Sequence, residues 1–438
     1  MPLDLPRVAI DADFWSLRFV DQTATTCAVR KNVPLPLERS RDRGVMATVY
    51  ADGGYGYAAT SDLTPEGLRR ALERARAWAA ATASRALFDT RPLPRPSPKG
   101  DYASPSVDAP DLAPREWYEL LMAESTAAAI DPRIVDWSAS VEVRHATHRL
   151  VTSEGGDVVQ RYRMMLPGLA ATAHADGDTQ TRTLNGYRGI CQQGGPEVLA
   201  RFGFVGAGRR VAEEALEIVL APNCPSGRMD VLLAPDQMVL QIHESIGHPL
   251  ELDRILGDER NFAGTSFVTP DMIGSYRYGS PLLNVTFDPT RPEELASYRY
   301  DDEGTPAERT FLIRDGILER PLGGAISQQR AGLPGVANAR ADNWNRPPID
   351  RMANLNIEPG DTSFGELVAR VERGVFMQTN ASWSIDDSRN KFQFGCEWGR
   401  LIEDGALTTV VRKPNYRGVS ASFWRSLAMI GGPGTVEV

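Results

Sequence analysis

The chain of 438 residues carries 57 acidic and 48 basic side chains, a formal net charge of -9, with 42% hydrophobic and 24% charged residues. These proportions are ordinary for soluble globular proteins. The acidic balance, with no Lys/Arg run, argues against a nucleic-acid-binding surface. We expect no membrane span, because no stretch approaches about 18 apolar residues. Residues 1–7 lack the basic and apolar regions of a signal peptide, so the cytoplasm is the default location.

Residues 13–60 are rich in β-branched and aromatic residues and predict strands, with a turn at residues 51–54. A helix follows, because Thr64 is a good N-cap and Pro65 suits the first helical position. Apolar residues then recur at helical spacing as far as Ala80.

Residues 91–114 carry seven prolines. Proline at this density disfavours helix and sheet alike, so we expect an exposed connector. A second helix is predicted over about 114–130. Residues 133–190 then read as a meander of strands, with turns at 153–156 and 175–178.

A third helix is predicted over residues 209–218, directly after a glycine-rich stretch at 203–208. That stretch lacks the preceding strand and the downstream acid of a dinucleotide site, so it is a weak signal. A compact apolar strand is expected at 228–234, and Pro235 opens another helix.

Residues 266–430 are expected to be mostly strands, interrupted by one short helix at about 364–372. We therefore predict an α+β fold with two domains. Residues 1–220 would form an N-terminal α/β domain and residues 221–438 a β-rich C-terminal domain. Four widely spaced cysteines without a CxxC pair do not make a disulfide framework: Cys27, Cys191, Cys224 and Cys396.

Two of only five histidines, His243 and His248, fall within the six-residue segment His-Glu-Ser-Ile-Gly-His. Neutral imidazoles are good zinc ligands, and catalytic zinc usually takes three protein ligands plus a water. Zinc lowers the pKa of that water to about 7, and a neighbouring carboxylate can accept its proton. Glu244 is placed for that role of general base. The alternative is that the two histidines are a core or capping pair on an ordinary helix end.

The spacing of the two histidines is unusual, because they stand at i and i+5 instead of i and i+4. An ideal α-helix would set them about 140° apart. Gly247 tolerates unusual dihedral angles, and Pro249 disfavours α geometry at His248. A turn of the π type would bring both imidazoles to one metal. We therefore predict that the helix ends at or just before His248 with a π-like last turn.

The stretch from His243 to Asp253 resembles the HExxGH-x-x-E-x-D segment of the TldD/PmbA family, named for modulation of DNA gyrase and now regarded as metallopeptidases. Softer similarity extends over almost the whole chain, at residues 44–68, 301–318, 351–354 and 401–405. The HExxGH segment is the specific part.

The resemblance implies an α/β N-terminal domain, a β-rich C-terminal domain and a dimer around an enclosed cavity. Such dimers often pair a metal-bearing subunit with a metal-free paralogue and trim or degrade flexible, unfolded or leader peptides. Carried over, His243 and His248 become ligands of Zn²⁺ and Glu244 the general base. The expected partners are a peptide and a second subunit, identical or paralogous, with no nucleic acid and no membrane.

In the family the third zinc ligand is a cysteine that follows the segment matching residues 430–433. This sequence ends at Val438 without such a cysteine, so either it is truncated, or it uses another ligand, or it binds zinc poorly. Cys396 and Asp253 are weak candidates, and Cys396 reads as a buried strand thiol. Glu251 fits better as a partner that orients an imidazole. Two hypotheses remain: a zinc peptidase, and a catalytically weak or inactive peptide-binding subunit of a heterodimer.

Two other groups of polar residues are weaker candidates. His145 and His148 lie on an expected strand, where side chains three residues apart point to opposite faces and cannot easily share a metal. The acidic run at residues 301–303 is expected to be a solvated turn.

Overall fold

The computed structural model describes residues 8–186 and 191–437. The expectations for residues 1–7, for residues 187–190 and for the chain end at Val438 lie outside the described residues. The protein is an α+β structure with several sheets, as the sequence predicts. Within the described ranges, no helix is both long and apolar enough to cross a membrane.

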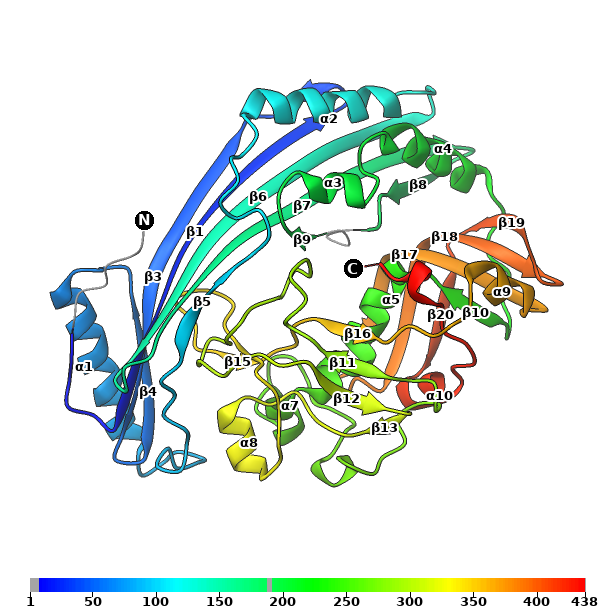
Figure 1. The fold of residues 1–438 in the computed structure, drawn as a ribbon. Coiled ribbons are helices and arrows are strands. Elements are labelled where there is room, and N and C mark those ends of the chain that lie inside the picture. The colour runs from blue at the N-terminus through cyan, green and yellow to red at the C-terminus, as the bar shows by residue number, and fades with distance from the viewer. Residues whose placement is uncertain (1–7, 187–190, 438) are drawn as a thin grey trace.

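A large, mainly antiparallel sheet forms an arch (Figure 1). Antiparallel pairing runs almost the full length of its long central strands. Its strands, in the order in which they pair, are β4 (Gly54–Thr60), β3 (Glu38–Ala51), β1 (Phe14–Arg30), β6 (Ile134–Thr152), β7 (Asp157–Ala175) and β5 (Lys99–Ala103), with β2 (Val33–Pro34) paired to β1, and β8 (Asp178–Thr183) and β9 (Gln192–Gln193) paired to β7.

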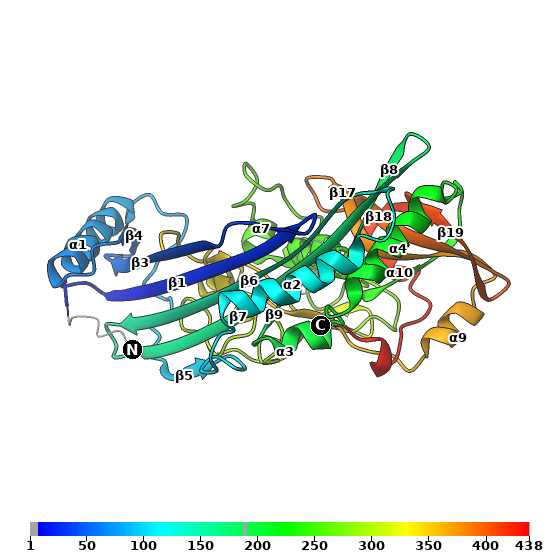
Figure 2. The same cartoon turned by 90° about the horizontal axis from the view of Figure 1, so that it is seen from above.

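Helices cover one face of this sheet at its two ends. α1 (Pro65–Thr82) packs on β1 through Leu17 and Phe19, whereas α2 (Pro114–Ala128) and α4 (Ala207–Leu220) share a core with Cys27 and Val29. These positions on β1 all have the same parity, so they lie on one face. Figure 2 shows α2 lying along β6 and β7, near the short α3 (Glu197–Arg201).

The structure confirms the predicted helix cap and the predicted turn in the N-terminal half. The side chain of Thr64 accepts a hydrogen bond from the backbone of Gly67, with Pro65 at the start of α1. Asp52 and Gly53 both have positive φ, which is the signature of the tight turn between β3 and β4.

The prediction of a structureless connector at residues 91–114 is wrong in part. Residues Lys99–Ala103 form β5, which pairs in parallel with β7. An edge position accommodates such a segment, because only one side of it must supply hydrogen bonds. The neighbouring prolines stand outside the paired residues.

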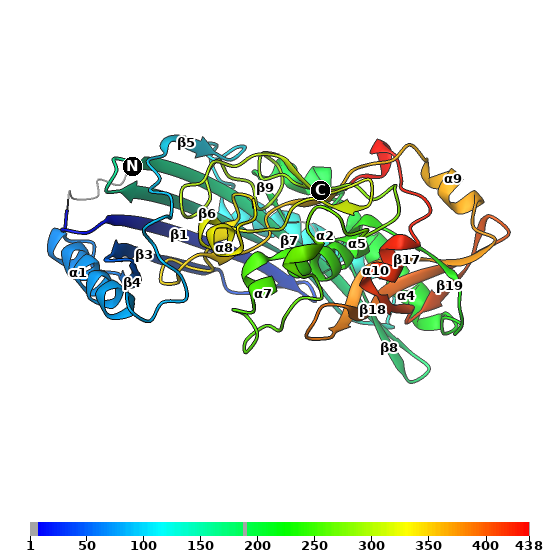
Figure 3. The same cartoon turned by 90° about the horizontal axis from the view of Figure 1, so that it is seen from below.

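The C-terminal half packs under the concave side of the arch (Figure 1), and the view from below shows it in front of the long strands (Figure 3). One sheet has the order β10 (Asp230–Leu233), β17 (Arg373–Ile385), β18 (Lys391–Glu403) and β19 (Ala406–Arg412), with β20 (Asn415–Val419) paired to β18. A second has the order β13 (Ile317–Leu318), β12 (Thr310–Arg314), β11 (Val285–Phe287) and β16 (Leu355–Ile357), and β14 (Ala339–Arg340) pairs with β15 (Ile349–Asp350). Ala146 and Tyr162 of the arch join the same core as Val285 and Phe287.

The C-terminal half holds more helix than predicted. The expected short helix is α9 (Phe364–Ala369), but α8 (Ala325–Ala331) and α10 (Ser420–Arg425) were missed. Both are too short to show a clear helical period. The remaining helical segments are α5 (Pro235–Ile242), the π-helix His243–Gly247, α6 (His248–Leu250), α7 (Leu252–Leu256) and the 3₁₀ turns Pro270–Met272 and Pro433–Thr435. A domain boundary at residues 220–221 stays a prediction.

Candidate metal centre

The two histidines of the HExxxH segment are brought to one face by a π turn. α5 leads from β10 into the π-helix, where the backbone N–H of His248 donates to the carbonyl of His243. This i to i+5 hydrogen bond widens the turn, so that residues five apart stack above one another. The prediction of a π-like turn is confirmed.

The prediction that the helix ends at or just before His248 is wrong, since the helical path continues through α6 to Leu250. Pro249 lacks the N–H that a helix would direct to the carbonyl of Ser245, four residues earlier. The hydroxyl of Tyr278 donates to that carbonyl instead. The chain therefore passes a proline without leaving the carbonyl unpaired.

Gly247 also acts differently from the expectation. Its φ of -57° and ψ of -65° are ordinary right-handed values, so conformational freedom is not needed. A Cβ there would lie 2.5 Å from the sulfur of Met352 and 3.2 Å from a methyl carbon of Leu355. Glycine lets these side chains approach the π turn closely.

A buried polar network holds the other face of the helix. Ser245 Oγ donates to the carbonyl of Gln241 and accepts from Trp424 Nε1 at 2.9 Å. The amide of Gln241 in turn accepts from the hydroxyl of Tyr416. Because the helix is fixed from behind, its opposite face presents His243 and His248 in a defined position.

His243, Glu244 and His248 form the candidate site. Their potential ligand atoms all lie within 4.8 Å of one another. The two imidazole rings are 4.5 Å apart between centroids and nearly perpendicular, at 84°. Burial, together with the neighbouring His248, lowers the pKa of His243 to about 3. The imidazole of His243 is therefore neutral at pH 7, which is the form that binds a metal.

The ring of His248 is oriented by a buried acid. His248 Nδ1 donates to Glu251 Oε2 at 2.8 Å, and Arg254 donates to the same oxygen through Nη2 at 3.0 Å. Burial raises the pKa of Glu251, but the hydrogen bond from His248 and the charges of Arg351 and Arg254 outweigh it, so the net pKa lies below the usual range. Glu251 is thus an ionised acceptor that fixes the tautomer of His248.

Glu244 is paired with an arginine that the sequence did not single out. Arg389 Nη1 lies 2.7 Å from Glu244 Oε2, and both side chains are largely buried. Arg389 stands in the turn between β17 and β18, far from the motif in sequence, and no local pattern marks it.

The candidates for a third ligand lie apart from this cluster. Cys396 is buried in β18 beside Phe392 and Phe394, as expected for a core thiol. Asp253 instead pairs with Asp350, each carboxylate accepting the backbone N–H of the other. Among the described residues, the clustered ligand atoms belong to His243, Glu244 and His248 alone.

The other polar groups have structural roles. His145 and His148 lie on opposite faces of β6, as predicted: His145 contacts Asp111, and His148 lies 3.9 Å from Asp302. The prediction of a solvated acidic turn is wrong, because Asp301 is buried and accepts the backbone N–H groups of Glu303, Thr305 and Ala339. This carboxylate is enclosed because it ties two loops together.

The glycine-rich stretch before α4 serves an internal contact. Gly206 and Gly208 donate their backbone N–H groups to the buried carboxylate of Glu124, at 2.6 and 2.8 Å. An acid of the chain itself occupies the helix N-terminus, a position that also attracts phosphate groups.

Two models of one protein family match the chain. The PmbA/TldA metallopeptidase C-terminal domain matches residues 226–436, and PmbA/TldA metallopeptidase domain 1 matches residues 15–79. Together they cover more than half of the chain. The chain belongs to the TldD/PmbA metallopeptidase family.

Relatives of the TldD/PmbA family agree with this assignment. A metalloprotease of Methanocaldococcus jannaschii is 35% identical over 204 residues, which are 47% of this chain and 43% of the relative. A metalloprotease TldD homologue of Haemophilus influenzae is 26% identical over 321 residues, covering 71% of this chain and 64% of the relative. The matched segments thus span less than two thirds of these relatives. The structure of TldE from Thermococcus kodakarensis shares the fold, with a TM-score of 0.76 at 15% identity, over 96% of this chain and 91% of that one.

The metal that the family name implies fits the residues present. Burial keeps the His243 imidazole neutral, and Glu251 occupies Nδ1 of His248. Nε2 of His248 makes no hydrogen bond with any residue that the structure describes, so it is left to bind a ligand. Two imidazoles beside one carboxylate are a donor set suited to a divalent transition metal.

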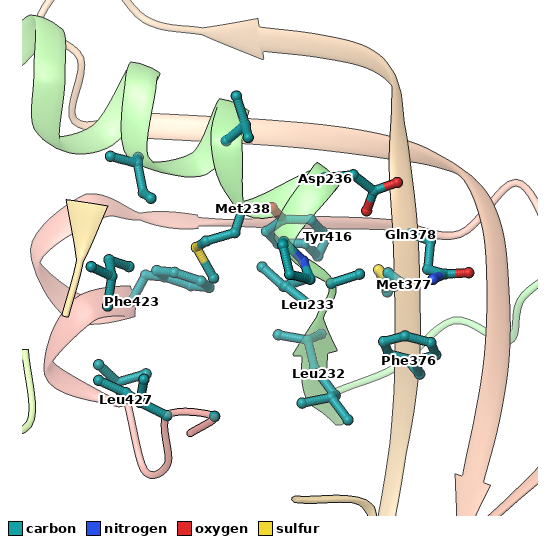
Figure 4. A pocket seen from close by; sticks show the side chains of 18 of the residues that line it. Leu232, Leu233, Asp236, Met238, Phe376, Met377, Gln378, Tyr416, Phe423 and Leu427 are labelled. Carbon is teal, nitrogen blue, oxygen red and sulfur yellow. The ribbon is translucent and has the colours of Figure 1, made fainter. Parts of the chain in front are cut away.

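A cavity of about 1880 Å³ adjoins this TldD/PmbA site, with His243 in its wall. β10 and β16, the edge strands of two different sheets, both line it. Figure 4 shows Met238 of α5 pointing toward Phe423 of α10, with Leu232 and Leu233 of β10 close by. A cavity of this volume has room for a peptide segment, and apolar side chains form much of its wall.

Proposed function

We propose that the protein is a zinc-dependent peptidase that cleaves flexible or unfolded peptides, including leader or precursor peptides. The π turn is the observation that carries this proposal. It sets His243 and His248 side by side with Glu244 next to them, and His243 lies in the wall of a cavity of about 1880 Å³. We also propose that the protein lies in the cytoplasm and forms a dimer, either of two identical subunits or with a paralogue.

His243 and His248 would hold the metal, and Glu244 would act as the general base. A bound zinc ion supplies Lewis-acid chemistry, by polarising the scissile carbonyl and lowering the pKa of water. Glu244 accepts a proton from the attacking water, whose oxygen joins the carbonyl carbon. The C–N bond then breaks, and Glu244 returns the proton to the leaving amine, so water is added across the peptide bond.

The free edge of β10 would hold the substrate. β10 pairs with β17 on one side, and no strand of the described residues pairs with its other side. The N–H of Ala234 points to β17, so by alternation the backbone groups of Val231 and Leu233 point to the free edge. An added strand would be recognised by its backbone, which gives broad sequence specificity.

A second candidate is a catalytically weak or inactive peptide-binding subunit that supports an active paralogue. Within the described residues the cluster offers two imidazoles, and its carboxylate is already paired with Arg389. Two protein ligands rarely make a catalytic zinc site. The shared fold with TldE is compatible with a two-subunit enzyme.

Zinc content and peptide cleavage distinguish the two. Elemental analysis of the wild type and of His243→Ala should show near-stoichiometric zinc that the variant loses. Glu244→Gln should keep zinc and lose cleavage of an unfolded protein, such as reduced casein. Zinc without cleavage, restored on mixing with a paralogue, would favour the subunit role. Full activity in Glu244→Gln would rule out its assigned role.

A further inference from the structure

The side chain of Arg389 is largely buried and contacts Glu244, the proposed base. It is 14% exposed, and the side chain of Glu244 is 8% exposed. Nη1 donates to Glu244 Oε2 at 2.7 Å, and Nη2 donates to the carbonyl of Ala263 at 2.8 Å. Nε is buried without a hydrogen-bond partner among residues 8–186 and 191–437. One planar guanidinium therefore spans two acceptors on different segments.

The backbone that carries this arginine is held in place before any substrate arrives. Arg389 has a φ of 62°, in the left-handed region that favours glycine. Asp386 Oδ1 accepts the backbone N–H groups of Asn390 and Lys391, and Ser420 Oγ donates to the carbonyl of Arg389 at 2.9 Å. Strained backbone kept by several hydrogen bonds is typical of positions that serve function.

The carbonyl of Ala263 connects this arginine to the other half of the site. Arg254 Nη1 also donates to it, while Arg254 Nη2 donates to Glu251, the acceptor that orients His248. Two arginines thus meet on one carbonyl. One holds the proposed base, and the other holds the partner of a proposed metal ligand.

We propose that Arg389 is a positioning residue that fixes the carboxylate of Glu244 toward the metal site. A general base works only within a narrow range of distances and angles, and a buried side chain held by one fork loses little entropy on binding. Lysine keeps the charge but is a point donor and cannot reproduce the planar bridge to Glu244 and Ala263. This inference rests on the proposed function for its catalytic consequence, but the contact can be tested without it.

Steady-state kinetics of the full chain test the catalytic part. Arg389→Ala should lower kcat about 10- to 100-fold, a part of the roughly 100- to 10,000-fold that general-base catalysis supplies. KM and zinc content should stay within twofold of the wild type, because Arg389 touches neither the peptide edge nor the histidines. Arg389→Lys should recover part of the activity, and added guanidinium should partly rescue the alanine variant. Arg373→Ala, an exposed arginine at the start of β17, is the matched control and should behave as wild type.

A double-mutant cycle in urea unfolding tests the contact itself and needs no turnover. If the pair exists, the destabilisations of Arg389→Ala and Glu244→Gln should not add in the double variant. Strict additivity, or unchanged kcat in Arg389→Ala, overturns the positioning role. A wild type that cleaves no peptide but shows coupling refutes the proposed function and leaves the contact established.

Discussion

His248 donates through Nδ1 to Glu251 at 2.8 Å, and this bond leaves Nε2 as the ring nitrogen available to a metal. Glu251→Gln removes the charge that fixes the tautomer. We expect zinc affinity to fall about 10- to 100-fold, the usual cost of losing such a partner. Competition with a chromophoric chelator would measure it. Glu217→Gln, an exposed acid on α4, should leave the affinity unchanged, and equal affinities in all three proteins would contradict the assigned orientation.

The free edge of β10 gives a second prediction. Val231→Pro removes a backbone N–H that points away from β17, so the sheet should survive while a bound peptide loses a hydrogen bond. Val231→Ala also loses the side chain but keeps the N–H. We expect KM for an unfolded substrate to rise several-fold in the proline variant relative to the alanine variant, with kcat and zinc content little changed. The same KM in both would exclude substrate addition at this edge.

The local backbone geometry of the site could be predicted from the sequence alone. The i and i+5 spacing, with a glycine and a proline around His248, predicted the π turn because the geometry of a helix depends on neighbouring residues. The role of Gly247 was misread, since the close approach of Met352, 105 residues away in the numbering of the chain, is a tertiary fact.

The features of the site that the sequence did not predict depend on contacts between residues far apart in the chain. Arg389 meets Glu244 across 145 residues, and Trp424 meets Ser245 across 179. No periodic pattern in the sequence predicts a contact between residues so far apart. The same holds for Asp301, which looked like a solvated turn and is buried by loops that join only when the arch and the C-terminal sheets pack.

The network behind the π turn predicts a cost in stability. Trp424→Phe keeps the aromatic ring but removes the Nε1 donor to Ser245, in a fully buried site. We expect a loss of about 0.5–1.5 kcal/mol in the free energy of unfolding, the usual net contribution of one hydrogen bond, because Gln241 Nε2 still donates to Ser245 Oγ. Urea denaturation would measure it. Trp383→Phe, at a side chain 60% exposed, is the matched control, and an equal loss in both variants would contradict the role of the network.

Glu124 closes the N-terminus of α4 with two charge-assisted hydrogen bonds. Glu124→Gln keeps the shape but replaces one acceptor oxygen with a donor that faces an N–H group. A destabilisation of about 1–3 kcal/mol is expected from hydrogen bonding and the helix dipole together. Glu119→Gln, on the exposed face of α2, should cost little. Indistinguishable unfolding midpoints for the two variants would show that the cap is not needed.

The raised pKa of Glu303 predicts that the stability of the fold depends on pH. Glu303 lines a cavity of about 200 Å³ between β1 and the loop at residues 301–306. Burial, together with the charges of Asp301, Asp350 and Asp302, raises its pKa to about 8. The folded pKa exceeds the unfolded value of about 4.3. The contribution of protonated Glu303 to the free energy of unfolding is therefore complete at low pH and is lost as the pH rises through 8.

Glu303→Gln should remove this dependence, since the amide is neutral at every pH. At pH 8.5, which lies above the folded pKa of about 8, scanning calorimetry should show a higher melting temperature for the variant than for the wild type. The difference should nearly disappear near pH 4, where the wild-type acid is mostly protonated in both states. Glu308→Gln, an exposed acid five residues later, should follow the wild type throughout. A shift in melting temperature of the same size at both pH values would mean that shape, and not the titration of Glu303, causes the effect.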